Sequence, residues 1–329
     1  MSDENSLFEL TSSHLNTGMR GIPVGTCRTS FVTPTEGVHY CGYPISELAS
    51  MLPEDVIYLL FNKELPNPEQ SSAFQEELKS RGAIPDGIEQ VLASLPLDGH
   101  PMDWLSIGIH TLGMLGGEGD WKSDALNLVA RMPRLLGLIF RYREGRSDNI
   151  PADDLSLDLV GRFTNTLDFG DVDKSIMDQV IATYLVLHMD HGGGNLSTFA
   201  GKAVASGHAS VYSSMAGAMN ALSGPLHGRA NQSCFEFVKK IGTSDPDEVE
   251  AFVRGELKAR RPVFGFGHAV LRAEDPRATV QFALGEKICP EDEYFKTIRV
   301  LREIAPKVLS ENPKISNPNA NVDIASGTL

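Results

Sequence analysis

Residues 258–277 read Lys258-Ala-Arg-Arg-Pro-Val-Phe-Gly-Phe-Gly-His-Ala-Val-Leu-Arg-Ala-Glu-Asp-Pro-Arg277 and contain five basic residues. A run of charges is most often a solvated surface. Here the charges bracket a flexible Gly-Phe-Gly-His, whose backbone N–H groups could line a phosphate or an adenine. The segment is not a dinucleotide-binding fingerprint, because no third glycine follows and no strand precedes it. It separates two stretches, 246–260 and 276–287, whose apolar residues have the spacing of helices.

The helical period of 3.6 residues continues on both sides of this segment. It predicts helices over 45–63, 69–81, 102–115, 124–143, 173–191, 209–222, 231–241, 246–260, 276–287 and 291–309. Period-2 alternation is confined to 29–43, which predicts one short β-hairpin, and 312–329 is expected to be a loop. Since no βαβ rhythm is present, we exclude a Rossmann or P-loop enzyme and predict an all-α fold.

Gly224-Pro225 interrupts the helical pattern and suggests a domain boundary. We predict a large, mainly helical domain over 1–225 and a smaller helical domain over 226–329. The segment 201–224 is rich in Ala, Gly and Ser, which permits helices to approach closely. Its small residues fit a tight helix crossing within the core or an interface between subunits.

Composition limits the classes of partner and site. The chain has 329 residues, 41% of them hydrophobic, and a net charge of −14, which argues against nucleic-acid and anionic-membrane partners. No apolar run approaches a membrane span, and the acidic start Met1-Ser-Asp-Glu lacks the features of a signal peptide. The four cysteines form no C-x-x-C pair and no cluster with histidines. We therefore expect a cytoplasmic protein without a metal or disulfide framework.

Two further segments place histidines among glycines. His188 and His191 lie one turn apart at the end of the helix predicted over 173–191. A metal site would need a third ligand, and a helix C-terminal histidine followed by a glycine stop explains the pattern equally well. His227 follows Gly-Pro-Leu, close to the start of the next predicted helix. The positive end of a helix disfavours imidazolium, so this ring would be neutral and could donate a hydrogen bond to an enolate oxygen.

Three motifs together resemble the signatures of the citrate synthase family. They are Gly-Pro-Leu-His227-Gly, Gly-Phe-Gly-His268-Ala-Val-Leu-Arg-x-x-Asp-Pro-Arg277 and Asn321-Val-Asp323-x-x-Ser-Gly. The N-terminal Gly18-Met-Arg20-Gly-Ile and Gly42-Tyr43-Pro-Ile are similar to the family as well. Order and spacing agree over nearly the whole chain, which makes the combined pattern far more specific than each motif alone.

The resemblance implies a large and a small helical domain with the active site in the cleft between them. It also implies condensation of acetyl-CoA with oxaloacetate and hydrolysis of citryl-CoA to citrate and CoA, without a metal or a permanently bound cofactor. On this resemblance, Asp323 is the catalytic base, His227 donates to the thioester oxygen, and His268 polarises the oxaloacetate carbonyl. His191 and Arg277 are expected to hold oxaloacetate, with Asn195 nearby.

For coenzyme A, the resemblance points to a local basic patch in this acidic chain. Arg20, Arg261 and Arg272 are expected near the CoA phosphates or adenine, and Val263, Gly265 and Gly267 along the nucleotide. The family dimerises through helices of the large domain. A homodimer, or a higher assembly of dimers, is therefore expected, with the small-residue helix over 209–222 as a candidate interface.

The sequence departs from the family pattern in three places. Gly192 stands where the family has an acidic residue beside the substrate-binding histidine, and the region 116–121 is shorter than in the longer members. The chain ends at Leu329, soon after Asp323, before helices that supply two arginines for substrate carboxylates. Either a further segment lies beyond Leu329 or this is a shortened relative. We expect this 329-residue form alone to be a poor catalyst, which thiol release at ordinary citrate synthase rates would contradict.

Three alternatives stay open. A 2-methylcitrate synthase uses propionyl-CoA and shares these motifs, and one methylene is discriminated by only about 1–3 kcal/mol. A citryl-CoA lyase is less favoured, because its short chains usually lack the N-terminal part present here. A non-catalytic assembly subunit would keep the helical dimer but not turnover.

Overall fold

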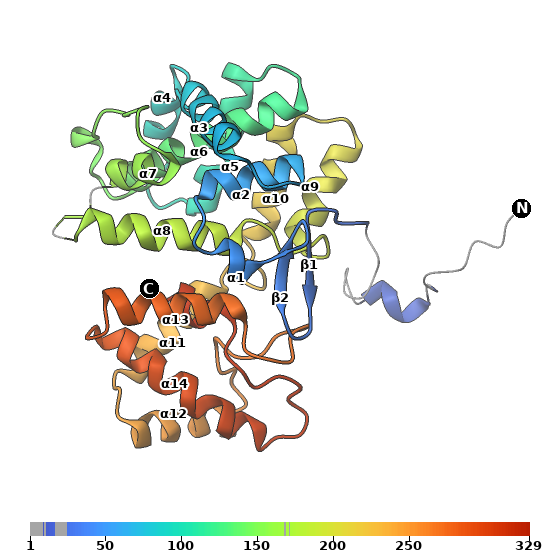
Figure 1. Cartoon of the computed structure of the whole chain (residues 1–329), viewed down its shortest axis with the longest axis vertical. Helices are drawn as coiled ribbons and strands as arrows, with labels where there is room; N and C mark the ends of the chain where they lie inside the picture. Colours follow the sequence, from blue (N-terminus) through green and yellow to red (C-terminus); the bar gives the residue numbers. More distant parts are fainter. Residues whose placement is uncertain (1–8, 10, 17–24, 168, 171) are drawn as a thin grey trace, which may run out of the picture.

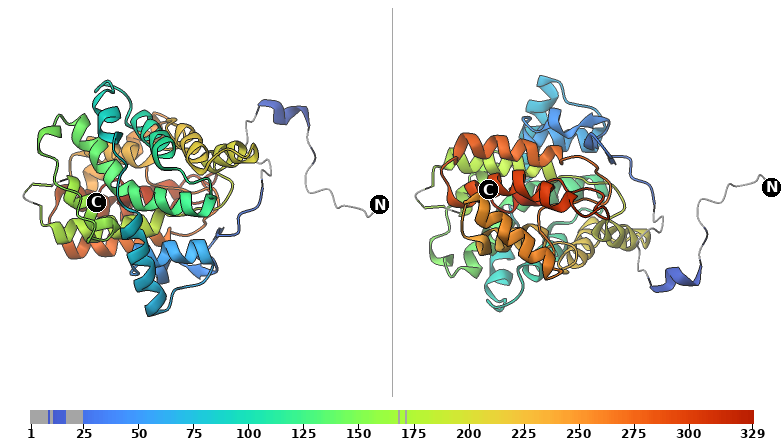
Figure 2. Two further views of the ribbon diagram at one scale, coloured as in Figure 1. Left: turned by 90° about the horizontal axis from the view of Figure 1, so that it is seen from above. Right: turned by 90° about the horizontal axis from the view of Figure 1, so that it is seen from below.

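The structure is a computed structural model that describes residues 9, 11–16, 25–167, 169–170 and 172–329. Over this part of the chain it contains fifteen α-helices and one small antiparallel sheet, which confirms the predicted all-α fold. Figure 1 shows α2 to α7, α9 and α10 on one side of the long helix α8, and α11 to α14 on the other. The hairpin β1–β2 lies beside the junction of these two groups, and Figure 2 shows the same arrangement from above and below.

The elements of the first half are a 3₁₀ turn at Ser12–Asn16, β1 Ser30–Thr33, β2 Gly37–Tyr40, β3 Tyr43–Pro44, α1 Ile45–Leu48, α2 Pro53–Asn62, α3 Pro68–Arg81, α4 Ile88–Ala93, α5 Pro101–Gly116, α6 Trp121–Arg143, a 3₁₀ turn at Ser147–Asn149 and α7 Leu159–Leu167. The second half contains α8 Lys174–His188, α9 Leu196–Ser206, α10 Val211–Leu222, α11 Ala230–Ile241, α12 Pro246–Lys258, α13 Pro276–Ile288, α14 Glu293–Ser310 and α15 Val322–Ser326.

The predicted hairpin is confirmed. β1 pairs antiparallel with β2, with Ser30 opposite Tyr40, and β3 adds a short third strand. All four residues of β2 are buried, because the hairpin packs against α1 and α13. The stretch predicted to form strands does so, although burial does not alternate along β2 and the sheet is too small to change the fold class.

Two predicted boundaries are wrong. The single helix predicted over 45–63 is two helices, α1 and α2, because Pro53 lacks the N–H that a continuous helix needs and instead occupies the first turn of α2. The predicted loop over 312–329 contains α15. Asn321 caps this helix by accepting the N–H of Asp323, and Val322, Ile324 and Ala325 are buried.

Besides α15, three helices have no counterpart in the prediction, namely α4, α7 and α9. The small-residue segment forms a tight crossing between α9 and α10 within one chain. A Cβ on Gly201 would lie 3.2 Å from the Ser214 carbonyl oxygen, and one on Gly217 would lie 3.0 Å from a Val204 methyl. The close helix approach therefore depends on these glycines.

Buried side chains form separate clusters on the two sides of α8. One cluster is built wholly from residues between Cys234 and Ala325, where α11 to α15 pack together. Another spans Ile88 to Ala216 and joins α4, α5, α6 and α10. A third cluster, beneath the hairpin, joins α1 and α2 to Val186 and Leu187 of α8. The division into domains at 225/226 stays a prediction.

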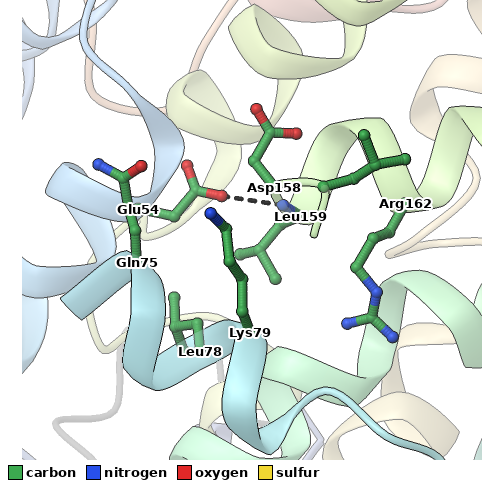
Figure 3. Close-up of a pocket in the computed structure, with 8 residues that line it drawn as sticks. Glu54, Gln75, Leu78, Lys79, Asp158, Leu159 and Arg162 are labelled. Atoms are coloured by element: carbon green, nitrogen blue, oxygen red, sulfur yellow. Dashed lines mark hydrogen bonds between the residues drawn. The ribbon is translucent and has the colours of Figure 1, made fainter. Parts of the chain in front are cut away.

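A buried arginine ties three elements of the first half together. Arg162 of α7 pairs with Asp153 at 2.7 Å and donates to the carbonyl oxygens of Ala130 and Gly82, at 2.7 and 2.9 Å. Beside it a pocket of about 10 Å³ contains Glu54, which accepts the N–H of Leu159 at 2.9 Å (Figure 3). Burial raises the pKa of Glu54. Polar groups, rather than apolar contacts alone, hold α2, α3, α6 and α7 in place.

We predict that Arg162→Leu lowers the free energy of unfolding by about 3–5 kcal/mol, because it leaves Asp153 and two buried carbonyl groups without a partner. Urea unfolding followed by circular dichroism measures this loss. Arg254→Leu is the matched control, since Arg254 is half exposed and pairs with Glu250 and Glu311 on the surface. It should change stability little. An equal loss in both variants would contradict the role assigned to Arg162.

Candidate active site

A cleft of about 1370 Å³ brings together residues from both groups of helices. The end of α8, the start of α9, the turn before α11, the loop before α13 and the start of α15 all contribute to its lining. Among the lining residues are six that the sequence analysis selected: His191, Asn195, His227, His268, Arg277 and Asp323. Residues separated by more than 130 positions therefore share one cavity.

The hairpin holds the loop after α8 that carries His191. Tyr40 of β2 donates to the carbonyl oxygen of Val186 at 3.0 Å and accepts the N–H of Asp190 at 3.2 Å. Thr29 donates to the Asp190 carboxylate at 2.5 Å. Two residues after Asp190, the backbone N–H of Gly192 donates to the Ser30 hydroxyl at 2.6 Å. The loop is thus fixed from outside by a strand pair far away in sequence.

His188 and His191 are both neutral at ordinary pH. Burial, reinforced by the charge of Arg277, lowers the pKa of each ring to about 4. The Nδ1–H of His188 donates to the Tyr184 carbonyl oxygen at 2.8 Å, so its Nε2 carries a lone pair. That Nε2 is buried and has no hydrogen-bond partner among the described residues. An acceptor without a partner in the described chain is thus buried at the end of α8.

His227 faces the first turn of α9. The N–H of Ser197 donates to Nε2 of His227 at 3.2 Å, and the Ser197 hydroxyl lies 3.0 Å from the same nitrogen. A nitrogen that accepts an N–H has a lone pair, so the proton of the neutral ring is on Nδ1. The helix whose N-terminus meets His227 is α9, rather than the following helix that the sequence analysis considered.

Asn195 has a structural role in the same place. Its side-chain oxygen accepts the N–H of Thr198 and the hydroxyl of Ser197, each at 2.8 Å, and thereby caps α9. Its amide donates to the carbonyl oxygen of Gly192 at 3.2 Å. Asn195 therefore links the loop of His191 to the helix start that faces His227.

A short antiparallel pairing joins the segment before His268 to the segment before Asp323. Phe266 and Ala320 form a β-bridge made by two backbone hydrogen bonds, from the Gly267 N–H to the Asn319 carbonyl oxygen at 3.0 Å and from the Asn321 N–H to the Gly265 carbonyl oxygen at 2.9 Å. One strand of this pairing leads directly into His268 and the other into α15. Two of the three catalytic motifs are joined by their backbones.

Nδ1 of His268 accepts two backbone N–H groups, from Val270 at 3.0 Å and from Leu271 at 2.9 Å. Its proton is therefore on Nε2, and the ring can donate only from that side. The ring packs edge to face against His191, with 5.5 Å between ring centres. Burial lowers the pKa of His268, the charges of Arg277 and Arg272 add to this effect, and Asp275 opposes it.

Arg277 and Asp275 form a buried ion pair at the start of α13. Arg277 Nη2 lies 2.7 Å from the Asp275 carboxylate, Arg277 Nε lies 3.1 Å from it, and Asp275 is fully buried. Burial would raise the pKa of Asp275, but the hydrogen bonds and charge of Arg277 outweigh it and lower the value. The pair fixes the guanidinium at the cleft wall, where it suits a carboxylate.

Asp323 lies at the second position of α15 and lines the cleft. Burial raises its pKa, Asp275 adds to the rise, and Arg277 opposes it. A carboxylate with a raised pKa is a stronger base than an exposed one. Since the backbone N–H of Asp323 is used by Asn321, the position of the carboxylate is set by the helix cap.

The residues predicted to bind CoA are placed differently. Arg20 lies outside the described residues. Arg261 is exposed and pairs with Glu256 at 2.6 Å, and the side chain of Arg272 lies against the turn 268–271. Val263, Gly265 and Gly267 are not among the described residues that line the cleft. Assignment of all six to CoA stays a prediction.

Sequence reasoning missed two polar groups of the site. His188, weighed as a helix end or a metal ligand, lines the cleft, and Ser197, which also lines it, was given no role. The spacing of Ser197 two residues after the capping Asn195 is a signal that could have found it. Within the described part of the chain, no group of three potential metal ligands is present, and no helix is long and apolar enough to cross a membrane.

Comparison with protein families gives one match. The model described as "Citrate synthase, C-terminal domain" matches residues 18–329. The chain is 33% identical to a mitochondrial citrate synthase of Citrus maxima, covering 95% of this chain and 72% of the relative. It is 34% identical to a mitochondrial 2-methylcitrate synthase of Yarrowia lipolytica, with 95% and 73% covered. Because these relatives are mitochondrial by name, the cytoplasmic location expected above stays a prediction.

Solved structures give the same fold. The citrate synthase of Thermotoga maritima superposes with a TM-score of 0.80 at 26% identity, covering 94% of this chain and 82% of the other. That of Pyrobaculum aerophilum superposes with a TM-score of 0.82 at 26% identity, covering 94% and 80%. The resemblance inferred from the three motifs is thereby confirmed.

We predict that His188 and His191 stay neutral in the folded protein down to about pH 5, because burial holds their pKa at about 4. In the unfolded chain a histidine takes up its proton near pH 6.5. The unfolded state therefore binds more protons between about pH 6.5 and 4, and the free energy of unfolding falls as the pH drops through this window. Histidine NMR titration, with His191→Gln to assign the signal, tests this. A His191 midpoint above pH 6 would contradict it.

Proposed function

This chain belongs to the citrate synthase family of acyltransferases, and we propose that it condenses acetyl-CoA with oxaloacetate and hydrolyses the citryl-CoA to citrate and CoA. One observation carries the proposal. A carboxylate with a raised pKa, Asp323, shares a cleft with two histidines, His227 and His268, each of which accepts a backbone N–H on one ring nitrogen and has no backbone partner on the other among the described residues. A base with two hydrogen-bond donors is what enolisation and carbonyl addition require.

The first step removes a proton from the methyl group of the thioester. Asp323 accepts this proton, and the Nδ1–H of His227 donates to the thioester oxygen as it becomes an enol oxygen. A neutral imidazole is the better-matched donor here, because its own proton is only weakly acidic and the α-proton is weakly acidic too. The first turn of α9, which occupies Nε2 of His227, keeps the ring in this donor form.

The second step forms the carbon–carbon bond. The enol carbon attacks the oxaloacetate carbonyl carbon, and the enol oxygen becomes a thioester carbonyl again. The Nε2–H of His268 polarises the oxaloacetate carbonyl oxygen and transfers its proton to it, which forms the hydroxyl of the product. Arg277 and His191 are proposed to hold the substrate carboxylate, with the guanidinium already positioned by Asp275. His268 is proposed to assist again when water cleaves the thioester and CoA leaves.

We propose coenzyme A thioesters as cosubstrates rather than resident cofactors, and a homodimer as the assembly. Apolar side chains at the ends of α5 and α6 and on α10 support the dimer, because they are exposed in the single chain. They are Met114 (77%), Leu115 (49%), Trp121 (67%) and Met215 (38%). A second copy would remove this surface from water.

The acyl donor distinguishes two members of the family. The identities to a citrate synthase and to a 2-methylcitrate synthase are nearly equal, at 33% and 34%. We expect kcat/KM for acetyl-CoA to exceed that for propionyl-CoA by about 10- to 200-fold, the range that one methylene allows in a shaped pocket. Thiol release measured with each donor at saturating oxaloacetate decides, and a preference for propionyl-CoA would identify a 2-methylcitrate synthase.

We expect Asp323→Asn to lower kcat by at least about 100-fold, because general-base catalysis contributes roughly that much. Thiol release from acetyl-CoA is the measurement, with circular dichroism to confirm folding. Asp247→Asn is the matched control: Asp247 has the same second position in α12, following an N-cap and a first-turn residue, and it is exposed. It should leave kcat unchanged. Unchanged turnover in Asp323→Asn would remove Asp323 from the role of base.

A further inference from the structure

The side chain of Arg272 lies over the turn that follows His268. Its Nη1 is 2.8 Å from the carbonyl oxygen of Leu271 and 3.0 Å from that of Val270. The carbonyl oxygens of Ala269 and His268 lie at 3.3 and 3.4 Å from Nη1, and Nη2 is 3.3 Å from that of Ala269. One guanidinium thus lies within hydrogen-bonding distance of the carbonyl oxygens of four successive residues.

The same peptide units hold the imidazole of His268. In the Ala269–Val270 peptide the carbonyl faces Arg272 and the N–H donates to Nδ1 of His268. In the Val270–Leu271 peptide the carbonyl is again on Arg272 and the N–H again on Nδ1. The guanidinium and the imidazole lie at opposite ends of two parallel peptide dipoles.

A cation at the carbonyl end strengthens the donor at the N–H end, because hydrogen bonds in a chain polarise one another. Two strengthened N–H donors on Nδ1 favour the neutral ring with its proton on Nε2. This is the nitrogen that faces the cleft. A lysine could not reproduce the contact, since its single ammonium group cannot reach several carbonyls in one plane.

We propose that Arg272 is a positioning residue for His268, acting through the peptides of residues 269–271 to keep the Nε2–H tautomer aimed into the cleft. This role is distinct from the contact with CoA phosphates that the sequence predicts for Arg272. Only the kinetic part of this inference rests on the proposed function, because the tautomer of His268 is measured in the substrate-free protein.

The charged and titratable groups around His268 are Arg272, Asp275, Arg277 and the ring of His191. The opposite charges of Arg277 and Asp275 offset each other, and His191 is neutral. Removing the charge of Arg272 therefore disturbs the surroundings of His268 less than breaking that ion pair would. The backbone N–H of Arg272 donates to the Pro34 carbonyl oxygen at 2.7 Å. That link to the hairpin survives any substitution of the side chain.

The test is ¹⁵N NMR of histidine-labelled protein without substrate, with His268→Gln to assign the ring. In the unsubstituted protein, Nδ1 of His268 should be unprotonated and Nε2 protonated. In Arg272→Gln, we expect the Nδ1–H tautomer to become visible and the pKa of His268 to rise, because a nearby positive charge is lost. Arg261→Gln, which removes the other described arginine predicted to contact CoA, should leave the His268 signals unchanged.

Kinetics provide the second measurement. At saturating substrates, kcat of Arg272→Gln should fall about tenfold or more, as for other residues that orient a reacting group through hydrogen bonds. Arg272→Lys should show a smaller loss and a smaller fraction of the Nδ1–H tautomer. If Arg272→Gln does not fold, complete absence of the Nδ1–H tautomer in Arg272→Lys contradicts the proposal.

Two outcomes separate the possible failures. Unchanged His268 signals in Arg272→Gln, with a loss confined to KM for acetyl-CoA, would overturn the positioning role and leave Arg272 as a CoA contact. A shifted tautomer in a protein that releases no thiol from acetyl-CoA would support the positioning role and instead contradict the proposed function.

Discussion

The site depends on the antiparallel pairing of residues 265–267 with 319–321. Two backbone hydrogen bonds join two loops that would otherwise be free to separate, and they bring the segments that carry His268 and Asp323 to the same cleft. The pairing needs Gly265, whose φ is +81° and on which a Cβ would lie 2.7 Å from Ile324 and 2.9 Å from Cys234. Any side chain there would push α15 away. The sequence analysis placed Gly265 along the CoA nucleotide, but its packing against α15 already requires a glycine at this position.

The electrostatics of the cleft follow one rule: positive charge is kept on arginine and off the histidines. Burial lowers the pKa of His191 and of His268, while backbone N–H groups on Nε2 of His227 and on Nδ1 of His268 fix which nitrogen of these two rings keeps a lone pair. Because the accepting nitrogen differs between the two rings, His227 donates from Nδ1 and His268 donates from Nε2. Two donors with one base can then serve two different oxygens, which matches condensation better than simple hydrolysis.

Much of the fold was predictable, and the failures have identifiable causes. Helical periodicity found α3, α5, α6, α8 and α10 to α14 to within a few residues, because each buries one apolar face. It missed α4 and α7, which have only six and nine residues, and α9, which is rich in small residues. It also missed α15, which is stabilised by the capping of Asn321 and by burial against α11 and α13 rather than by its own sequence.

Local pattern and motif spacing were enough to predict the helical class, the hairpin and the family, and to select His191, His227, His268, Arg277 and Asp323 as candidate site residues. The folded chain sets which nitrogen of His227 and of His268 carries the proton, why Asp323 is a stronger base than an exposed carboxylate, and where the side chain of Arg272 lies. Such properties depend on burial and on hydrogen bonds from distant segments. Ser197 meets His227 across 30 residues, and Tyr40 meets Asp190 across 150.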